Sequence, residues 1–110
     1  MSYDVDLTIE SKTIGGDVVE TDVFWRNHTS NTSRMWREAG ADLGEFHGKK
    51  AGDLTEALYD AIQEMLDDPA KYRAMEAPNG WGSYESTLGF LTAILYACCR
   101  YPDAVMGVSR

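Results

Sequence analysis

The segment from Tyr84 to Tyr101 is apolar on almost every side of a helix, and it constrains the fold more than any other feature of the chain. Two stripes of large apolar residues run along it at helical spacing: Tyr84, Leu88, Leu91 and Leu95, and Phe90, Ile94, Ala97 and Tyr101. A helix with this pattern is buried on most sides, so the other elements must pack around it. Ser83 provides an N-cap side chain at its start, and Pro102 ends it.

Two strands are predicted ahead of this helix. Tyr3 to Glu10 alternates apolar and polar residues, which is the period of a strand with one buried face. Val18 to Trp25 is rich in β-branched and aromatic residues, and Gly15-Gly16 predicts the turn of an antiparallel hairpin. Alternation in the second strand predicts one face with Val19, Thr21, Val23 and Trp25 and the other with Glu20 and Asp22.

Local signals predict three shorter helices and a third strand. Arg34 to Ala39 is predicted as a short helix that stops at Gly40. Asp53-Leu54-Thr55-Glu56 has the form of a capping box, Asp68-Pro69 starts another helix, and Ala104 to Val108 is β-capable. We therefore expect an α+β fold, a small antiparallel sheet of two or three strands with about four helices packed on one face, as a single domain over residues 1-110.

The charge balance excludes several kinds of partner. Among 110 residues there are 10 Lys and Arg against 18 Asp and Glu, a formal net charge of -8. Direct nucleic-acid binding needs basic residues to neutralise phosphates, and anionic membrane surfaces need the same. The start of the chain has no signal-peptide pattern, and the longest apolar stretch, Leu88 to Cys99, is too short to span a bilayer. A cytoplasmic location is expected.

No motif predicts catalysis or a metal. His28 and His47 lie far apart with no cysteine near either, so neither a metal site nor a cofactor is predicted, and both are expected at the surface or in loops. Cys98 and Cys99 fall late in the apolar helix, where burial opposes thiolate formation, and are expected to be core residues. With no nucleophile and base arranged in a motif, we assign no catalytic residue and expect a protein that is not an enzyme.

The predicted hairpin places carboxylates close together. We expect Asp4 and Asp6 on the first strand to lie across from Glu20 and Asp22 on the second. Such a cluster either is a solvated sheet face or binds a hard cation through its oxygens.

A polar run and a tryptophan loop form the candidate ligand site. Polar side chains alternate from Asn27 to Ser33, where they either cap the next helix or present hydrogen-bonding groups to a ligand. In the loop around Trp81, the indole either plugs the core or contacts a partner. The candidate ligand-binding residues are Asn27, Thr29, Asn31, Arg34, Trp36, Asn79 and Trp81.

Glu56, Asp60 and Glu64 form a second candidate surface. They recur at i, i+4 spacing on the helix that follows Asp53, on the side opposite its apolar residues. The stripe is either a solvated helix face or a partner-binding surface that steers a basic protein toward the chain.

Five segments resemble a family of small acidic proteins of unknown function from bacteriophages and actinobacterial genomes. They are Asn27-x-Thr29-x-Asn31, Met35 to Gly40, His47 to Asp53, Tyr72 to Met75 and Asn79 to Glu85. The resemblance implies a phage accessory protein that acts on host factors, including defence proteins, in the cytoplasm of a bacterial host. It transfers no activity and no residue roles.

Two functional hypotheses follow. The first is a non-enzymatic, phage-like accessory protein that binds a host protein with a basic surface and inhibits or sequesters it. In this hypothesis Glu56, Asp60 and Glu64 of the present chain are the contact residues. The alternative is a protein that binds a small phosphorylated or nucleotide-like ligand between the Asn27–Arg37 segment and the Trp81 loop. The oligomeric state is left open.

Overall fold

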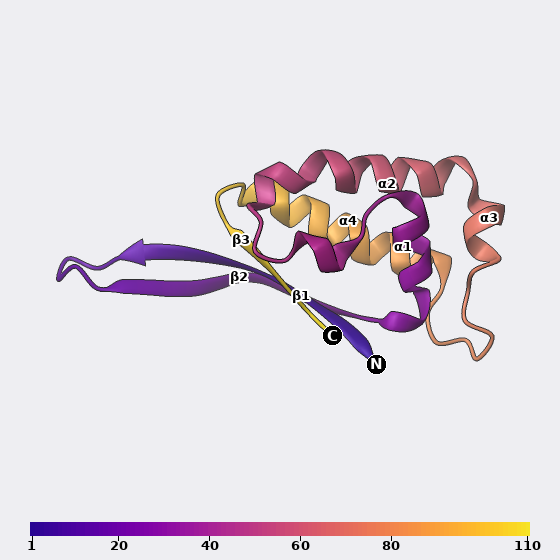
Figure 1. The fold of residues 1–110 in the computed structure, drawn as a ribbon, viewed down its shortest axis with the longest axis horizontal. Helices are drawn as coiled ribbons and strands as arrows, with labels where there is room; N and C mark the ends of the chain where they lie inside the picture. The colour runs from indigo at the N-terminus through magenta and orange to yellow at the C-terminus, as the bar shows by residue number, and fades with distance from the viewer.

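The chain folds into a three-stranded antiparallel sheet with four α-helices, a small α+β fold as expected from the sequence. The computed structural model describes residues 1–110. The strands are β1 (Ser2–Lys12), β2 (Val18–Thr29) and β3 (Val105–Ser109), in the order β2-β1-β3. The helices, which cover one face of the sheet (Figure 1), are α1 (Ser33–Ala39), α2 (Thr55–Asp67), α3 (Pro69–Arg73) and α4 (Tyr84–Arg100).

The covered face of the sheet is set by β1, whose Tyr3, Val5 and Leu7 are fully or almost fully buried. Tyr3 meets the edge of the Trp36 ring from α1 at a centroid distance of 5.1 Å. Trp36 in turn lies 5.6 Å from the Phe90 ring of α4. This aromatic chain joins the sheet to two helices, and its T-shaped and tilted geometry is favoured by ring quadrupoles.

A β-bulge in β2 overturns the predicted facing of that strand. Leu7 pairs with Phe24 while Thr8 pairs with Asp22, so Val23 is the extra residue. The bulge shifts the alternation by one position. Trp25 therefore lies opposite Asp6 on the open face, and not with Val19 and Thr21 as the uninterrupted pattern predicted. Phe24, Arg26 and His28 face the helices instead.

The helix boundaries follow local chemistry in most places. Ser83 and Ser86 form a reciprocal capping box at the start of α4, and Asp68 caps α3 by accepting from the Lys71 amide, with Pro69 following it. Gly40 ends α1 with φ 106°. The predicted capping box at Asp53 is wrong: a 3₁₀ turn, Ala51–Leu54, precedes α2, and no side chain caps that helix. Further 3₁₀ turns cover Ser30–Thr32 and Leu43–Phe46.

The hairpin extends well beyond the helices and makes the molecule 55 Å long against 26 and 19 Å in the other directions (Figure 1). Along β1, β3 pairs with Asp4 to Thr8 and no further, so the outer part of β1 pairs with β2 alone. Ile14 at the tip and Val18 and Val19 on the arm are exposed. Because this arm lies beyond the helices, it gains little stability from the core, and two-stranded ribbons are only marginally stable in water.

We predict that truncating Leu91 destabilises the whole chain. Leu91 is completely buried in α4. Leu91→Ala should lower the free energy of unfolding by about 2–5 kcal/mol, because truncation removes buried apolar surface and leaves a cavity in the core. Chemical denaturation measures this loss. In hydrogen exchange, α4 amides should exchange only through global unfolding; rapid exchange along α4 would contradict this architecture.

Candidate functional site

The polar run after β2 and the Trp81 loop meet in space. The Asn31 side-chain amide donates to the Trp81 carbonyl at 3.4 Å. Gly82 makes this approach possible, because its φ is 104° and a Cβ there would lie 2.7 Å from Thr29 and 2.8 Å from Thr32. Only glycine tolerates both the left-handed backbone and the contact. The glycine after Trp81 is thus the residue that joins the two segments.

A cleft of about 470 Å³ lies where they meet. It is lined by five of the seven candidate ligand residues together with the start of the chain: Asn27, Thr29, Asn31, Asn79 and Trp81, with Met1 and Ser2. Trp81 is 70% exposed and does not plug the core. The cleft therefore exists as a surface feature with one aromatic wall.

The polar groups of this cleft are largely used by the fold. Asn27 donates to the Asp4 carboxylate at 2.8 Å, Thr29 accepts from the Asn31 amide at 3.2 Å, and Asn79 accepts from the Trp81 amide at 3.0 Å. These are strand and turn contacts. No lysine or arginine side chain lines the cleft. Its chemistry is consequently poor for a phosphorylated ligand, which needs cationic donors.

Two of the predicted ligand residues lie elsewhere. Trp36 is completely buried in the core between Tyr3 and Phe90, so its assignment as a ligand residue is corrected: it is a packing residue. Arg34 is exposed on α1 but lines none of the three cavities of the molecule. Because residues two apart on a helix point to nearly opposite sides, Trp36 enters the core while Arg34 faces solvent.

His28 is half-buried, and not the surface residue that the sequence suggested. Its ring stacks on Phe90 at 4.9 Å, and its Nε2 lies 3.1 Å from the Thr32 hydroxyl and 3.2 Å from the Thr87 hydroxyl. Burial lowers the pKa of His28 from its ordinary value of 6.5. The imidazole is therefore held neutral as a hydrogen-bonding link between β2 and α4.

This environment predicts a pH dependence of stability. A histidine with a lowered folded-state pKa binds protons more readily when unfolded, so its stabilising contribution is present above pH 6.5 and is lost as the pH falls through and below that value. The difference in unfolding free energy between the wild type and His28→Gln should therefore shrink between neutral and mildly acidic pH. Denaturation at both pH values measures it, and a difference that grows on acidification would contradict the assignment.

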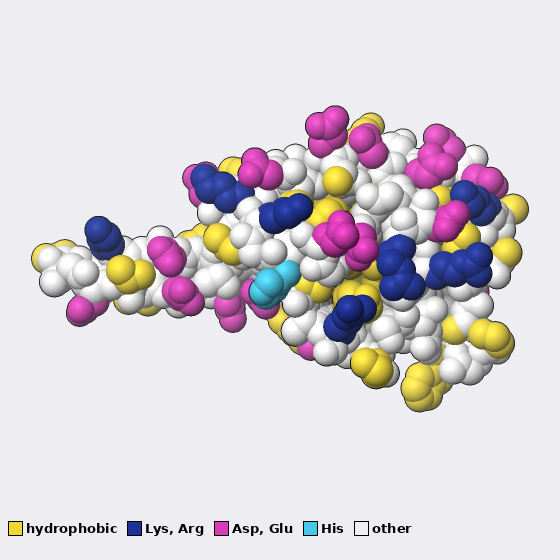
Figure 2. All heavy atoms as spheres, in the orientation of Figure 1, with side chains coloured by type: hydrophobic (Ala, Val, Ile, Leu, Met, Phe, Trp, Pro, Cys, Tyr) yellow, Lys and Arg dark blue, Asp and Glu magenta, His cyan; other side chains and the backbone are white.

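The acidic stripe lies where the sequence placed it. Glu56, Asp60 and Glu64 are all exposed on α2, and none of them takes part in an ion pair. Figure 2 shows acidic side chains gathered along the surface over this helix. Exposed tyrosine and leucine side chains, Tyr59 and Leu66, lie on the same helix. The stripe is accessible, and its role in binding stays a prediction.

A second acidic surface covers the open face of the sheet, where the sequence predicted a cluster of carboxylates but not the exposed tryptophan among them. The register places Asp6 opposite Trp25, Thr8 opposite Asp22 and Glu10 opposite Glu20, and paired residues share a face. The predicted pairing of Asp4 and Asp6 with Glu20 and Asp22 is wrong in register, because Asp4 lies opposite Asn27. Trp25 is 62% exposed among these acids. This arrangement depends on the bulge at Val23, which the sequence does not reveal.

The structure contains no group of three or more His, Cys, Asp or Glu side chains placed to hold a metal ion. His47 instead accepts a hydrogen bond from the Val108 amide through Nδ1, at 3.0 Å.

Cys98 is buried, as expected, whereas Cys99 is exposed, which corrects its assignment to the core. Burial, with a smaller effect of the neighbouring Cys99, raises the pKa of the Cys98 thiol to about 11.

The two cysteines should differ sharply toward a thiol reagent. At neutral pH almost none of Cys98 is thiolate and its sulfur is shielded, whereas Cys99 is accessible. Iodoacetamide followed by mass spectrometry should modify Cys99 first and Cys98 only as fast as the chain unfolds. Equal rates for both thiols in the folded protein would contradict the packing of α4.

Comparison with protein-family models, with curated proteins and with solved structures found no match to this chain. The resemblance to phage and actinobacterial proteins therefore stays a prediction. None of the helices is both long and apolar enough to cross a membrane.

Proposed function

We propose that this chain is a non-enzymatic binding protein that captures a partner protein with a basic surface, and that the open face of the sheet is its main contact surface. In the phage setting that the sequence resemblance implies, the partner would be a host protein that is inhibited or sequestered. The observation that carries the proposal is the exposed Trp25 among carboxylates that have no ion-pair partner.

Trp25 and its neighbours suit a lysine or arginine side chain. An indole face attracts a cation, and Asp6 and Asp22, on the same face, supply the opposite charge. Tryptophan is also enriched among the residues that dominate binding energy at interfaces. A net charge of -8 steers a basic partner toward the chain over longer distances.

The small-ligand alternative has a cleft but lacks the matching charge. Asn31 and Trp81 do line one cavity, as that hypothesis requires. The arginines expected to bind a phosphate do not line this cavity. One lining residue, Asn27, instead donates a hydrogen bond to the Asp4 carboxylate, a negative charge that opposes an anionic ligand. The open sheet face is therefore the better supported site.

The test compares two charge-matched triple variants. Asp6→Asn/Glu20→Gln/Asp22→Asn changes the sheet face, and Glu56→Gln/Asp60→Asn/Glu64→Gln changes α2; each removes three negative charges, so the long-range steering changes equally. The probe is a fluorescein-labelled peptide of alternating arginine and serine, followed by anisotropy from about 50 mM to about 500 mM NaCl. The sheet-face variant should bind it more weakly than the α2 variant.

Trp25→Ala should weaken the same peptide about tenfold, or ~1.4 kcal/mol, while Trp81→Ala and Asn31→Ala should bind it like the wild type. A greater loss in the α2 variant would place the contact on Glu56, Asp60 and Glu64. Unchanged affinity in both Trp25→Ala and the sheet-face variant would reject the proposed surface.

A further inference from the structure

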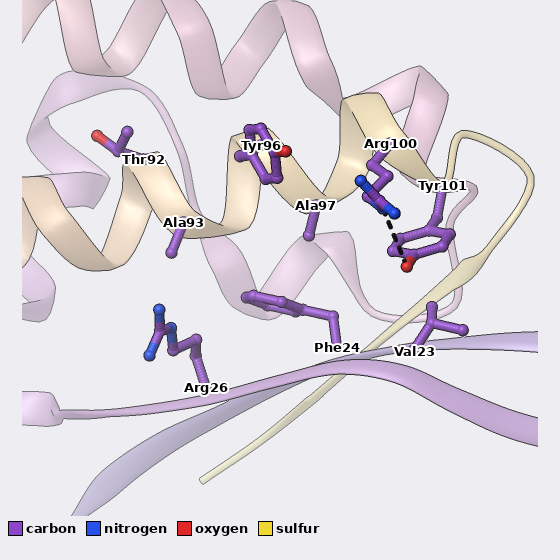
Figure 3. A pocket seen from close by; sticks show the side chains of 9 residues that line it. All are labelled: Val23, Phe24, Arg26, Thr92, Ala93, Tyr96, Ala97, Arg100 and Tyr101. Carbon is purple, nitrogen blue, oxygen red and sulfur yellow. Dashed lines mark hydrogen bonds between the residues drawn. The ribbon is translucent and has the colours of Figure 1, made fainter.

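Two neighbouring cavities lie in line between β2 and α4, share Arg26 in their walls, and together form what we call the groove. The first, of about 460 Å³, is lined by Phe24 and Arg26 from β2 and by the second half of α4 (Figure 3). The other, of about 340 Å³, is lined by Arg26 and His28 from β2 and by the first half of α4. Arg26 belongs to both, so the groove runs along the inner side of β2 from Val23 to His28.

The groove has the dimensions of a short extended peptide. It follows α4 from Ser86 to Arg100, which is about 21 Å at a helical rise of ~1.5 Å per residue. An extended chain covers that length with about six residues. β2 is an edge strand, so the outward-pointing N–H and C=O groups of its alternate residues have no partner in the sheet. Beyond the bulge at Val23, the strand from Phe24 to Thr29 is regular.

The walls of the groove favour apolar and anionic side chains. Phe24, Ala93 and Tyr101 give it apolar surface. Arg26 and Arg100 provide positive charge, and neither forms an ion pair within the chain. The Arg100 guanidinium donates to the Tyr101 hydroxyl at 3.1 Å, which holds it over the groove (Figure 3). These are the only two arginines that line any cavity in this acidic chain.

Gly89 supports the assignment. It lies inside α4, where glycine costs about 1 kcal/mol relative to alanine, yet a Cβ there would touch nothing within 4 Å. Packing therefore does not require glycine at this position. Its missing side chain leaves the groove open beside His28.

We infer that the groove binds an extended segment of the partner as a fourth strand, paired with the free edge of β2 from Phe24 to Thr29. This rests on the proposed function, since it names how the partner binds. The side chains of the added strand alternate: those facing α4 are apolar or carboxylates, which meet Phe24 and Arg26. Those facing the open side are lysine or arginine, which lie beside Trp25 and Asp22. Edge-strand addition with side-chain pockets is a general mode of peptide recognition.

The probe for this inference is a library of random dodecapeptides displayed on yeast and sorted for binding to the full-length chain. The enriched peptides should alternate apolar or acidic residues with basic ones. Gly89→Leu fills the groove at an exposed helical position and should fold at least as well as the wild type. It should weaken the enriched peptides about tenfold or more, whereas Cys99→Leu, at an exposed position of α4 that lines neither cavity, should leave them unchanged.

Charge reversal and backbone protection give independent readouts. Arg26→Glu should weaken the same peptides, while Arg37→Glu, an equal charge change on α1, should not. In hydrogen exchange, the outward-facing amides of β2 should become protected when the peptide is bound. Equal binding by Gly89→Leu and Cys99→Leu, or peptide binding without protection of β2, would overturn the inference.

The experiments distinguish failure of the proposed function from failure of the groove inference. If the sheet-face variant and Trp25→Ala lose the arginine–serine peptide but Gly89→Leu loses nothing, the binding function stands and the groove inference falls. If the library yields no enriched peptide at all, the groove inference also falls, and the sheet-face test alone decides the function.

Discussion

The burial of Tyr3, Val5 and Leu7 beneath the helices is the constraint from which the surfaces of this molecule follow. Once these three side chains occupy the core, the residues that alternate with them along β1 must point to the other face of the sheet, and this places Asp4 and Asp6 on the open side. The antiparallel register then carries the same division onto β2. The aromatic contacts of Tyr3 with Trp36, and of Trp36 with Phe90, hold α1 and α4 against that face and so define one wall of the groove.

The bulge at Val23 gives the two sides of β2 their opposite chemistry. If the alternation of β2 continued without a bulge through Val23, Trp25 would point toward α4 and Arg26 would point to the open face. The acidic face would then contain an arginine, and the groove would be filled by an indole in place of Arg26. The bulge therefore gives β2 an acidic open face with an exposed indole and, on its other side, a groove lined by Arg26. Bulges commonly redirect side chains at functional sites in this way.

The parts of the structure that depend on local chemistry were predictable from the sequence, and those that depend on pairing were not. Alternation in β1, the cap at Ser83 and the Asp68-Pro69 start all act within a few residues, so the α+β class and most boundaries followed from them. The bulge is a property of two strands together and leaves no mark in the composition of either. β2 continues through Asn27 to Thr29 because Asn27 bonds across to Asp4, a contact that a single strand does not reveal.

The candidate site likewise has features that the sequence indicated and features that only the three-dimensional packing reveals. The alternative ligand hypothesis required the Asn27–Arg37 segment to meet the Trp81 loop, but the sequence left open whether they meet. In the structure Asn31 contacts this loop, and Gly82 provides the physical cause. The exposure of the three tryptophans was not indicated by the sequence, because residue type alone does not distinguish the buried Trp36 from the exposed Trp25 and Trp81. Their positions relative to the core decide it: Trp36 lies on the inner side of a short helix, and Trp25 lies two residues past the bulge at Val23.

The short length of the groove limits how strongly it can bind a partner alone, and the projecting arm can supply a second contact. A six-residue strand buries much less surface than the roughly 1,200–2,000 Å² of a standard stable interface, so the groove by itself supports a weak, rapidly reversible contact. The arm extends the same edge strand beyond the bulge and exposes Val18 and Val19. A partner that contacts both the groove and the arm joins two weak contacts through one continuous strand, and the second contact then forms at high effective concentration. The bulge prevents a single uninterrupted ladder along the whole edge, which favours such two-part binding over indiscriminate strand addition.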